Sequence, residues 1–139
     1  MTLAQISLIR ASFTRVVMAR ETSAELFYNR LFELDPSLRP LFKGDMKEQG
    51  LKFFLMLEIV VGGLNAFEDV VAELRALGQR HIEYGVLPRH YLTVREALLW
   101  MLNQVLGKDF TGETRMAWME MYDLLSRAMV ELPAKDEGS

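Results

Sequence analysis

The sequence predicts an all-α protein with a single domain. Apolar residues recur at steps of three and four along most of the chain, and no segment alternates convincingly as a strand does. Capping residues, prolines and glycines stand between these segments. Seven or eight helices of unequal length, with no continuous heptad repeat, favour crossed-helix packing around a pocket over a regular bundle. A chain of 139 residues is long enough for one hydrophobic core.

The first helix is expected to open with a capping box. Thr2 and Gln5 have the required spacing, and apolar residues at helical intervals follow them. Residues 26–34 belong to a second amphipathic helix, which ends at Asp35. Pro36 then opens a short, turn-like helix, because proline is tolerated at the first helical position.

The middle of the chain contains two longer helices separated by glycines. Pro40 and the turn Lys43-Gly44-Asp45 mark a corner, and the Asp45 carboxylate is expected to cap a helix that runs to about Gly62. The next helix starts at Glu68 with two acidic residues, which suit a helix N-terminus, and stops near Gly85.

Two closing helices complete the expected fold. Pro88 breaks the chain, and residues 91–106 and 113–132 then form helices on either side of a turn bounded by glycines. We therefore expect one domain over residues 1–132, followed by a flexible C-terminal tail over residues 133–139.

Composition excludes several classes of function. The net charge of −3 offers no basic patch for nucleic acid or for an anionic membrane. The absence of cysteine excludes disulfides, thiolate nucleophiles and cysteine-based metal sites. The most apolar stretch, residues 53–67, is interrupted by Glu58 and is too short to span a bilayer, and no signal peptide is visible. We expect a cytoplasmic location.

His81 is the most informative residue of the chain. Val71, Leu74, Gly78 and His81 follow one another at steps of three, four and three, which places the imidazole on an otherwise apolar helix face. Burying an imidazole without a partner costs a few kcal/mol. The partner is either a backbone carbonyl or the metal of a cofactor, and for His81 taken alone the core histidine is the simpler interpretation.

Two further faces complement that histidine. Gln49, Phe53, Met56 and Val60 form an apolar stripe that starts with one amide, and Tyr28 lies among apolar neighbours on another helix. Taken singly, Tyr28 is an ordinary core tyrosine and Gln49 an exposed helix residue. Because His81 places an imidazole on a third helix, Tyr28 and Gln49 together indicate a phenol and an amide that face the same interior pocket.

Several local sequences follow one another in a distinctive order. They are Leu26-Phe27-Tyr28-Asn29-Arg30-Leu31-Phe32, Pro40-Leu41-Phe42, Leu77-Gly78-Gln79-Arg80-His81, Tyr84-Gly85-Val86, His90-Tyr91, and Ala117-Trp118 with Tyr122. In this order and spacing, from about Ile6 to Met129, the chain resembles the bacterial single-domain globins and the globin half of flavohaemoglobins. The resemblance implies a globin fold, with seven to eight helices packed 3-over-3 around haem b.

The resemblance also assigns roles to residues. It implies that His81 is the proximal haem ligand, that Phe42 wedges against the porphyrin, and that Tyr28 and Gln49 are the distal polar pair. Phe53 would line the distal pocket. A phenol O–H and an amide N–H are donors suited to the negative charge that iron-bound oxygen acquires.

The proximal side departs from the flavohaemoglobin pattern. In that family a tyrosine and a glutamate brace the proximal imidazole. The tyrosine has its counterpart in Tyr91, but the glutamate position aligns with Pro133, with Glu131 nearby. A weaker brace makes His81 a less electron-donating ligand, which favours reversible gas binding over oxygen activation.

The remaining site candidates are peripheral. Met56 would add to the apolar face, while Lys52, Arg80 and Arg89 are candidates to meet the haem propionates or, alternatively, are solvated surface charges. His90 follows a helix-breaking proline, and we expect it at an exposed helix start, where it is a poor second iron ligand.

The resemblance implies a protein that binds O2, NO and CO at a pentacoordinate ferrous iron. It implies further that the oxygen-bound form converts NO to nitrate, the activity of a nitric oxide dioxygenase. The chain ends at Ser139 with no flavin domain, so turnover would need a separate flavin or NAD(P)H reductase. The alternative is non-enzymatic oxygen binding, for storage, delivery or sensing. A haem-free signalling globin would leave His81 unexplained. We expect no nucleic acid or membrane partner, and a monomer or weak homodimer.

Overall fold

The computed structural model describes residues 1–83 and 85–130, and within that part it contains only helices and their connections. The six α-helices and three short 3₁₀ helices are α1 (Leu3–Met18), α2 (Arg20–Leu34), η1 (Pro36–Leu41), α3 (Met46–Gly62), η2 (Leu64–Ala66), α4 (Glu68–Glu83), α5 (Pro88–Leu106), η3 (Gly107–Asp109) and α6 (Gly112–Val130). The seven helical segments expected from the sequence are all present.

Local capping explains where two of these helices begin. The Gln5 backbone N–H donates to Thr2 Oγ1 at 3.1 Å, and the Thr2 N–H donates to Gln5 Oε1 at 2.9 Å, which confirms the capping box. The Asp45 carboxylate accepts from the Lys47 N–H at 3.0 Å, so Asp45 caps α3 as expected.

Two helices begin earlier than the periodicity indicated. α2 already starts at Arg20, and α5 starts at Pro88, three residues before Tyr91. Proline at the first helical position loses no intrahelical hydrogen bond, so Pro88 opens α5 where we expected a break. The predictions for Glu131 and for the tail over residues 133–139 lie outside the described residues.

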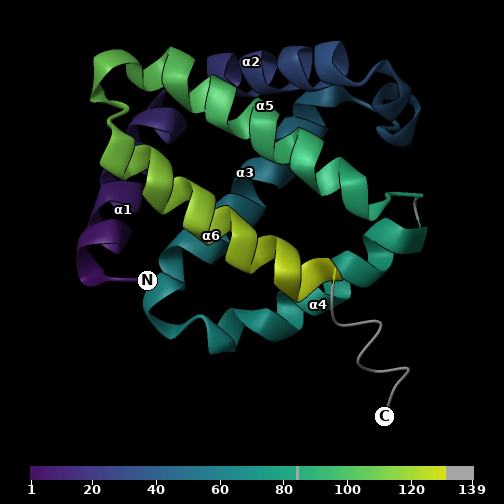
Figure 1. Cartoon of the computed structure of the whole chain (residues 1–139). Helices are drawn as coiled ribbons and strands as arrows, with labels where there is room; N and C mark the ends of the chain where they lie inside the picture. Colours follow the sequence, from purple (N-terminus) through teal and green to yellow (C-terminus); the bar gives the residue numbers. More distant parts are fainter. Residues whose placement is uncertain (84, 131–139) are drawn as a thin grey trace.

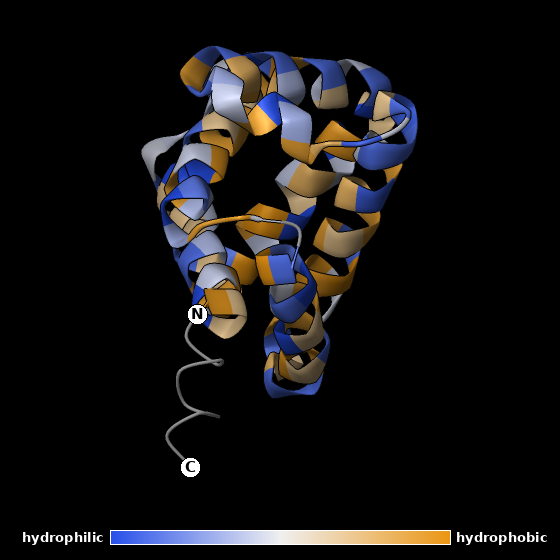
Figure 2. Cartoon of the chain, turned by 90° about the vertical axis from the view of Figure 1, so that its right-hand side faces the viewer, coloured by the Kyte–Doolittle hydropathy of each residue, from blue (hydrophilic) through white to orange (hydrophobic). Residues whose placement is uncertain are grey.

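Two pairs of helices form opposite edges of the molecule. α2 and α5 lie side by side along one edge, and α4 packs against α6 at the other (Figure 1). α1 contacts both α5 and α6. Figure 2 shows hydrophilic and hydrophobic residues interspersed along the helices, as expected of amphipathic helices that share one core.

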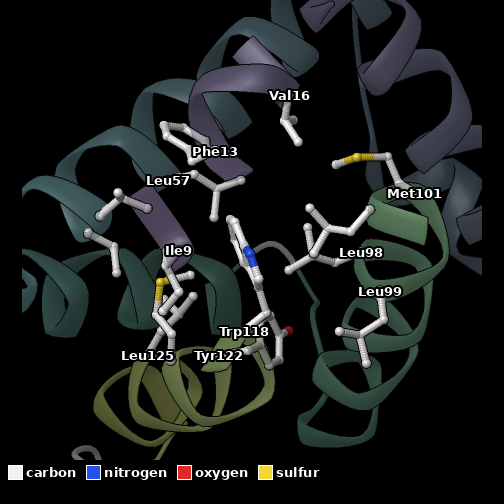
Figure 3. Packing of buried hydrophobic residues seen from close by; sticks show 14 of the residues in the cluster. Ile9, Phe13, Val16, Leu57, Leu98, Leu99, Met101, Trp118, Tyr122 and Leu125 are labelled. Atoms are coloured by element: carbon white, nitrogen blue, oxygen red, sulfur yellow. The ribbon is translucent and has the colours of Figure 1, made fainter. Parts of the chain in front are cut away.

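The main core surrounds Trp118 of α6. Its indole is fully buried, and side chains from α1, α3 and α5 point toward it, among them Ile9, Leu57 and Leu98 (Figure 3). The indole N–H donates to Ser12 Oγ at 2.9 Å, so the one polar atom of the ring has a partner. This part of the protein is densely packed, and the polar group at its centre is satisfied.

Glycines allow two close helix contacts. A Cβ atom on Gly78 of α4 would clash with the carbonyl oxygen of Met129 in α6, at a separation that no real side chain tolerates. A Cβ on Gly50 of α3 would lie 3.1 Å from the Cβ of Ala24 in α2. The first contact holds the helix of His81 directly against α6.

Candidate functional site

The site begins with His81, in the last turns of α4. Its Nδ1 lies 2.8 Å from the carbonyl oxygen of Leu77, one turn earlier. A carbonyl can only accept, so Nδ1 carries the proton and the neutral ring keeps its lone pair on Nε2. Burial lowers the pKa of His81, as does the nearby charge of Arg80, and together they outweigh the opposing effect of the Leu77 hydrogen bond. At neutral pH the ring therefore offers a free nitrogen lone pair.

Tyr91, in the first turns of α5, is the aromatic neighbour of that imidazole. The ring centroids are 6.3 Å apart and the rings are tilted by 32°. Burial raises the pKa of the Tyr91 phenol to about 12, so it is neutral at physiological pH. The hydroxyl of Tyr122 in α6 donates to the backbone carbonyl of Tyr91 at 2.7 Å.

A second aromatic group brings Tyr28, Phe42 and Phe53 together from three different segments. The Tyr28 ring lies 5.5 Å from Phe42, edge to face, and 6.5 Å from Phe53. The Phe53 ring stacks on Phe27 at 4.4 Å, with the two planes only 11° apart. Three residues to which the resemblance gave roles around haem therefore lie in one aromatic group.

The Tyr28 side chain is buried, and its hydroxyl makes no hydrogen bond within the described residues. Burial raises the pKa of this phenol well above its usual value of 10.0. Tyr28 is therefore a protonated donor whose O–H is available for a ligand.

Gln49 does not join Tyr28 in this structure. Its amide Nε2 donates to the carbonyl oxygen of Lys43 at 2.8 Å, in the corner that precedes α3. The side chain is half-buried. The two members of the expected polar pair are therefore separate, and the Tyr28 phenol has no hydrogen-bond partner within residues 1–83 and 85–130.

The other expected contacts vary in exposure. Met56 is half-buried one turn beyond Phe53 and packs against the core. Lys52, Arg80 and Arg89 are exposed, and none forms an ion pair with another described residue. They remain free to meet an anionic group or water.

One expectation about the second histidine is wrong. His90 does lie in the first turn of α5, but its side chain is only 6% exposed. Its Nδ1 accepts from the Leu87 N–H at 2.9 Å, and this bond caps α5 while folding the ring inward. The lone pair on Nδ1 is thereby engaged, so burial does not turn His90 into a ligand.

Three contributors to the site were missed by the sequence analysis. The Leu77 carbonyl fixes the tautomer of His81, where the sequence offered a backbone carbonyl as one possible partner but did not identify Leu77; Phe27 extends the aromatic group, and Gly50 lets α3 approach α2 beside Tyr28. Gly50 had a detectable signal, because a glycine inside a helical pattern often marks close packing. Leu77 had none, since every helical residue has a carbonyl four positions before it.

The available donors fit an iron porphyrin better than a bare metal ion. Nowhere in residues 1–83 or 85–130 do three or more His, Asp or Glu side chains cluster to hold a metal. His81 supplies a single nitrogen, so the other ligands of a metal bound there would have to come with a cofactor. Half-buried apolar side chains, here Phe42, Phe53 and Met56, suit the faces of such a disc.

Comparison with known proteins defines the class. The family model described as Globin matches residues 25–129, so the chain belongs to the globin family. The all-α globin fold expected from the sequence is thereby confirmed.

Individual relatives refine this placement. Neuroglobin of Tetraodon nigroviridis is 30% identical over 88% of this chain and 86% of its own length. Neuroglobin of Danio rerio is 32% identical over 93% of this chain and 90% of its own. The solved structure of an engineered carbene transferase, a variant of a putative nitric oxide dioxygenase from Rhodothermus marinus, matches with a TM-score of 0.85 at 26% identity. The match covers 99% of this chain and 96% of that one.

Membership of the globin family implies binding of haem and, through it, of O2 and other gases. Among the helices of the described part, none has the length and apolar character needed to cross a membrane.

Proposed function

We propose that His81 Nε2 would hold haem b, and that the bound haem would supply the position at which this globin takes up O2, NO or CO. The observation that carries the proposal is the state of the imidazole. His81 is half-buried, its Nδ1–H is held by the Leu77 carbonyl, and its pKa is lowered by burial. A neutral, oriented imidazole with a free nitrogen is the axial ligand that haem iron requires.

The apolar residues hold and orient the cofactor. Phe42, Phe53 and Met56 are the half-buried side chains that would pack on the porphyrin, and Tyr91 lies beside the His81 ring. Lys52 is proposed to meet a propionate, because it is exposed and has no ion pair with a described residue. Haem, when bound, supplies an iron that binds diatomic gases reversibly.

Tyr28 is proposed as the main donor to a bound gas. Its phenol is buried, protonated and unpaired among the described residues, so it can donate without first breaking another bond. Gln49 must leave the Lys43 carbonyl before it can donate, and we expect its contribution to be smaller. Each donor is worth about 1–3 kcal/mol in gas retention.

Conversion of NO and O2 to nitrate is the enzymatic form of this proposal. It is supported by the likeness to a protein named a putative nitric oxide dioxygenase and by the phenol donor at Tyr28. Joining NO to O2 as nitrate consumes one electron, and ferrous haem, if bound at His81, would supply it. We propose a separate flavin or NAD(P)H reductase as the source of the returning electron, and we expect both proteins in the cytoplasm.

Non-enzymatic oxygen binding is the second candidate. The observation that favours it is the neutral Leu77 carbonyl that accepts from His81 Nδ1, where a carboxylate would push more electron density to iron. A less electron-donating imidazole favours reversible binding over oxygen activation. The two candidates share one site and differ in the fate of the bound oxygen.

Absorption spectra test the shared part. The protein reconstituted with hemin should show a five-coordinate ferrous form that binds CO, and His81→Ala should lose haem far faster. His90→Ala is the matched control and should retain it, because its Nδ1 is engaged by Leu87. A colourless wild-type protein, or equal retention by His81→Ala, would refute the proposal.

Kinetics separate the two candidates. Tyr28→Phe should raise the O2 dissociation rate by about 5- to 100-fold, and Gln49→Leu by less. Stopped-flow mixing of NO with the O2-saturated ferrous protein should give nitrate and ferric protein in one fast step. Slow or incomplete conversion would leave reversible oxygen binding as the function.

A further inference from the structure

We propose that α6 sets the relative position of the two proximal helices, and that the Tyr122 hydroxyl is the contact that holds Tyr91 beside His81. This inference rests on the proposed role of His81 as haem ligand. The Tyr122 hydroxyl bonds to Tyr91 and not to His81, so its role is that of a positioning residue.

The first observation concerns the packing of the helices. α4 carries His81 and α5 carries Tyr91, yet these two helices make at most a weak direct contact. Each packs instead against α6. In Figure 1, α6 crosses the molecule between α5 and the edge formed by α4. The separation of the two helices therefore depends on how each docks on α6, together with the short connection in which the Val86 N–H donates to the His81 carbonyl at 2.9 Å.

The second observation is the contact that fixes α4. Gly78 lies one turn before His81, and its backbone approaches that of Met129 so closely that a Cβ would clash with the Met129 carbonyl oxygen. A backbone-to-backbone contact cannot be adjusted by a change of side-chain rotamer. The distance between His81 and α6 is set with little freedom.

The third observation is the contact that fixes α5. The Tyr122 hydroxyl donates to the Tyr91 carbonyl at 2.7 Å, across 31 positions of sequence. Tyr122 is 6% exposed, and its ring is one of the core side chains that α6 presents in Figure 3. The acceptor is the main chain of Tyr91, so the bond positions the backbone from which that aromatic ring projects.

The surroundings of Tyr122 keep its hydroxyl protonated. Burial is the main cause that raises its pKa, and the adjacent Tyr91 phenol acts in the same direction. The cation of Arg95 opposes this shift, while Asp123, which pairs with Arg95 at 3.4 Å, reinforces it. The O–H therefore remains a donor at physiological pH.

Loss of this bond should change the environment of the imidazole without removing a ligand. With phenylalanine at position 122 the core keeps its ring, but the first turns of α5 are no longer tied to α6. Tyr91 can then shift relative to His81, and the imidazole loses a neighbour that restricts its rotation. Groups that orient a ligand in this way tune the metal it holds.

The test is the iron–histidine stretching band of the ferrous protein, measured by resonance Raman spectroscopy. In Tyr122→Phe we expect the band to shift and broaden, and haem release to rise by up to about 10-fold. Ser23→Ala is the matched control, because Ser23 is fully buried and also donates to a main-chain carbonyl, that of Val16 at 3.1 Å. It should leave the band unchanged.

A double-mutant cycle decides whether the effect passes through Tyr91. In a Tyr91→Leu background, the further change Tyr122→Phe should no longer move the band. An unchanged band in Tyr122→Phe, an equal shift in Ser23→Ala, or an undiminished shift in the Tyr91→Leu background would each overturn the inference. Absence of the band from the wild-type protein would instead refute the ligation by His81 and the inference with it.

Discussion

The core around Trp118 and the site around His81 are packed in opposite ways. Trp118, Ile9 and Leu102 are entirely buried, and the indole N–H is bonded to Ser12. At the site, the imidazole and the Phe42 ring are half-buried, together with most of the large side chains around them. One region is complete by itself, whereas the other leaves apolar side chains half-buried and one donor, the Tyr28 phenol, without a hydrogen bond to a described residue.

This difference separates stability from function. The Trp118 core supplies packing that does not depend on a cofactor, so it can hold α1, α5 and α6 together in the apoprotein. The incomplete packing at the site is what a large apolar cofactor would fill. Substitutions in the first region should act on folding, and substitutions in the second should act on haem and gas binding.

The largest effect on folding is expected from Trp118→Ala. Removing a fully buried indole should lower the free energy of unfolding of the apoprotein by about 3–5 kcal/mol. Chemical denaturation followed by circular dichroism measures this change. Phe42→Ala is the comparison from the half-buried site and should cost the apoprotein much less. Equal losses would contradict the division between the two regions.

A smaller but still large effect is expected from Gly78→Ala. The added Cβ would meet the Met129 backbone, so α4 and α6 must separate, at a cost of about 1–3 kcal/mol. Gly62→Ala provides the control, because a Cβ there has nothing within 4 Å. Thermal unfolding of both apoproteins should show a lower Tm for Gly78→Ala alone.

Ser12→Ala probes the satisfied polar group of the core. The Trp118 N–H would lose its acceptor and stay buried, which costs about 1–3 kcal/mol. Denaturant titration of the apoprotein measures the loss. If the variant is as stable as wild type, the indole has found another acceptor and the core is less rigid than described.

Two buried tyrosines sharpen the comparison further. Tyr122→Phe removes a hydrogen bond and should lower the free energy of unfolding by about 1 kcal/mol. Tyr28→Phe removes a hydroxyl with no partner among the described residues, and should change apoprotein stability by less than about 0.5 kcal/mol. Measured under the same conditions, Tyr122→Phe should therefore lose more unfolding free energy than Tyr28→Phe.

The last expected effect appears only in the alkaline range. Burial raises the pKa of Tyr91 to about 12 from its usual 10.0, so the folded state holds this proton more tightly than the unfolded state. Stability linked to Tyr91 is complete below the usual pKa of 10.0 and is lost as the pH rises toward about 12. Tyr91→Phe should therefore reduce the slope of unfolding free energy against pH in that window. An identical slope would show that Tyr91 is not shielded.

Sequence alone determined those features of this protein that depend on residues close to one another along the chain. The helices, the capping box of Thr2 and Gln5, the Asp45 cap and the apolar face of His81 all follow from residues within a few positions of one another. The globin landmarks depend on the same short spacings and on their order along the chain. These interactions are local, so a linear pattern contains them.

Only the tertiary structure decided how the side chains of the site are used. In the folded protein Gln49 donates to the Lys43 carbonyl, His90 is buried at the start of α5, and the Tyr122 hydroxyl donates to the backbone of Tyr91. The last of these depends on contact between segments far apart in sequence, and the other two on the exact path of a corner or helix start. The periodicity of a helix states which face is apolar, but it does not state which neighbour will meet that face.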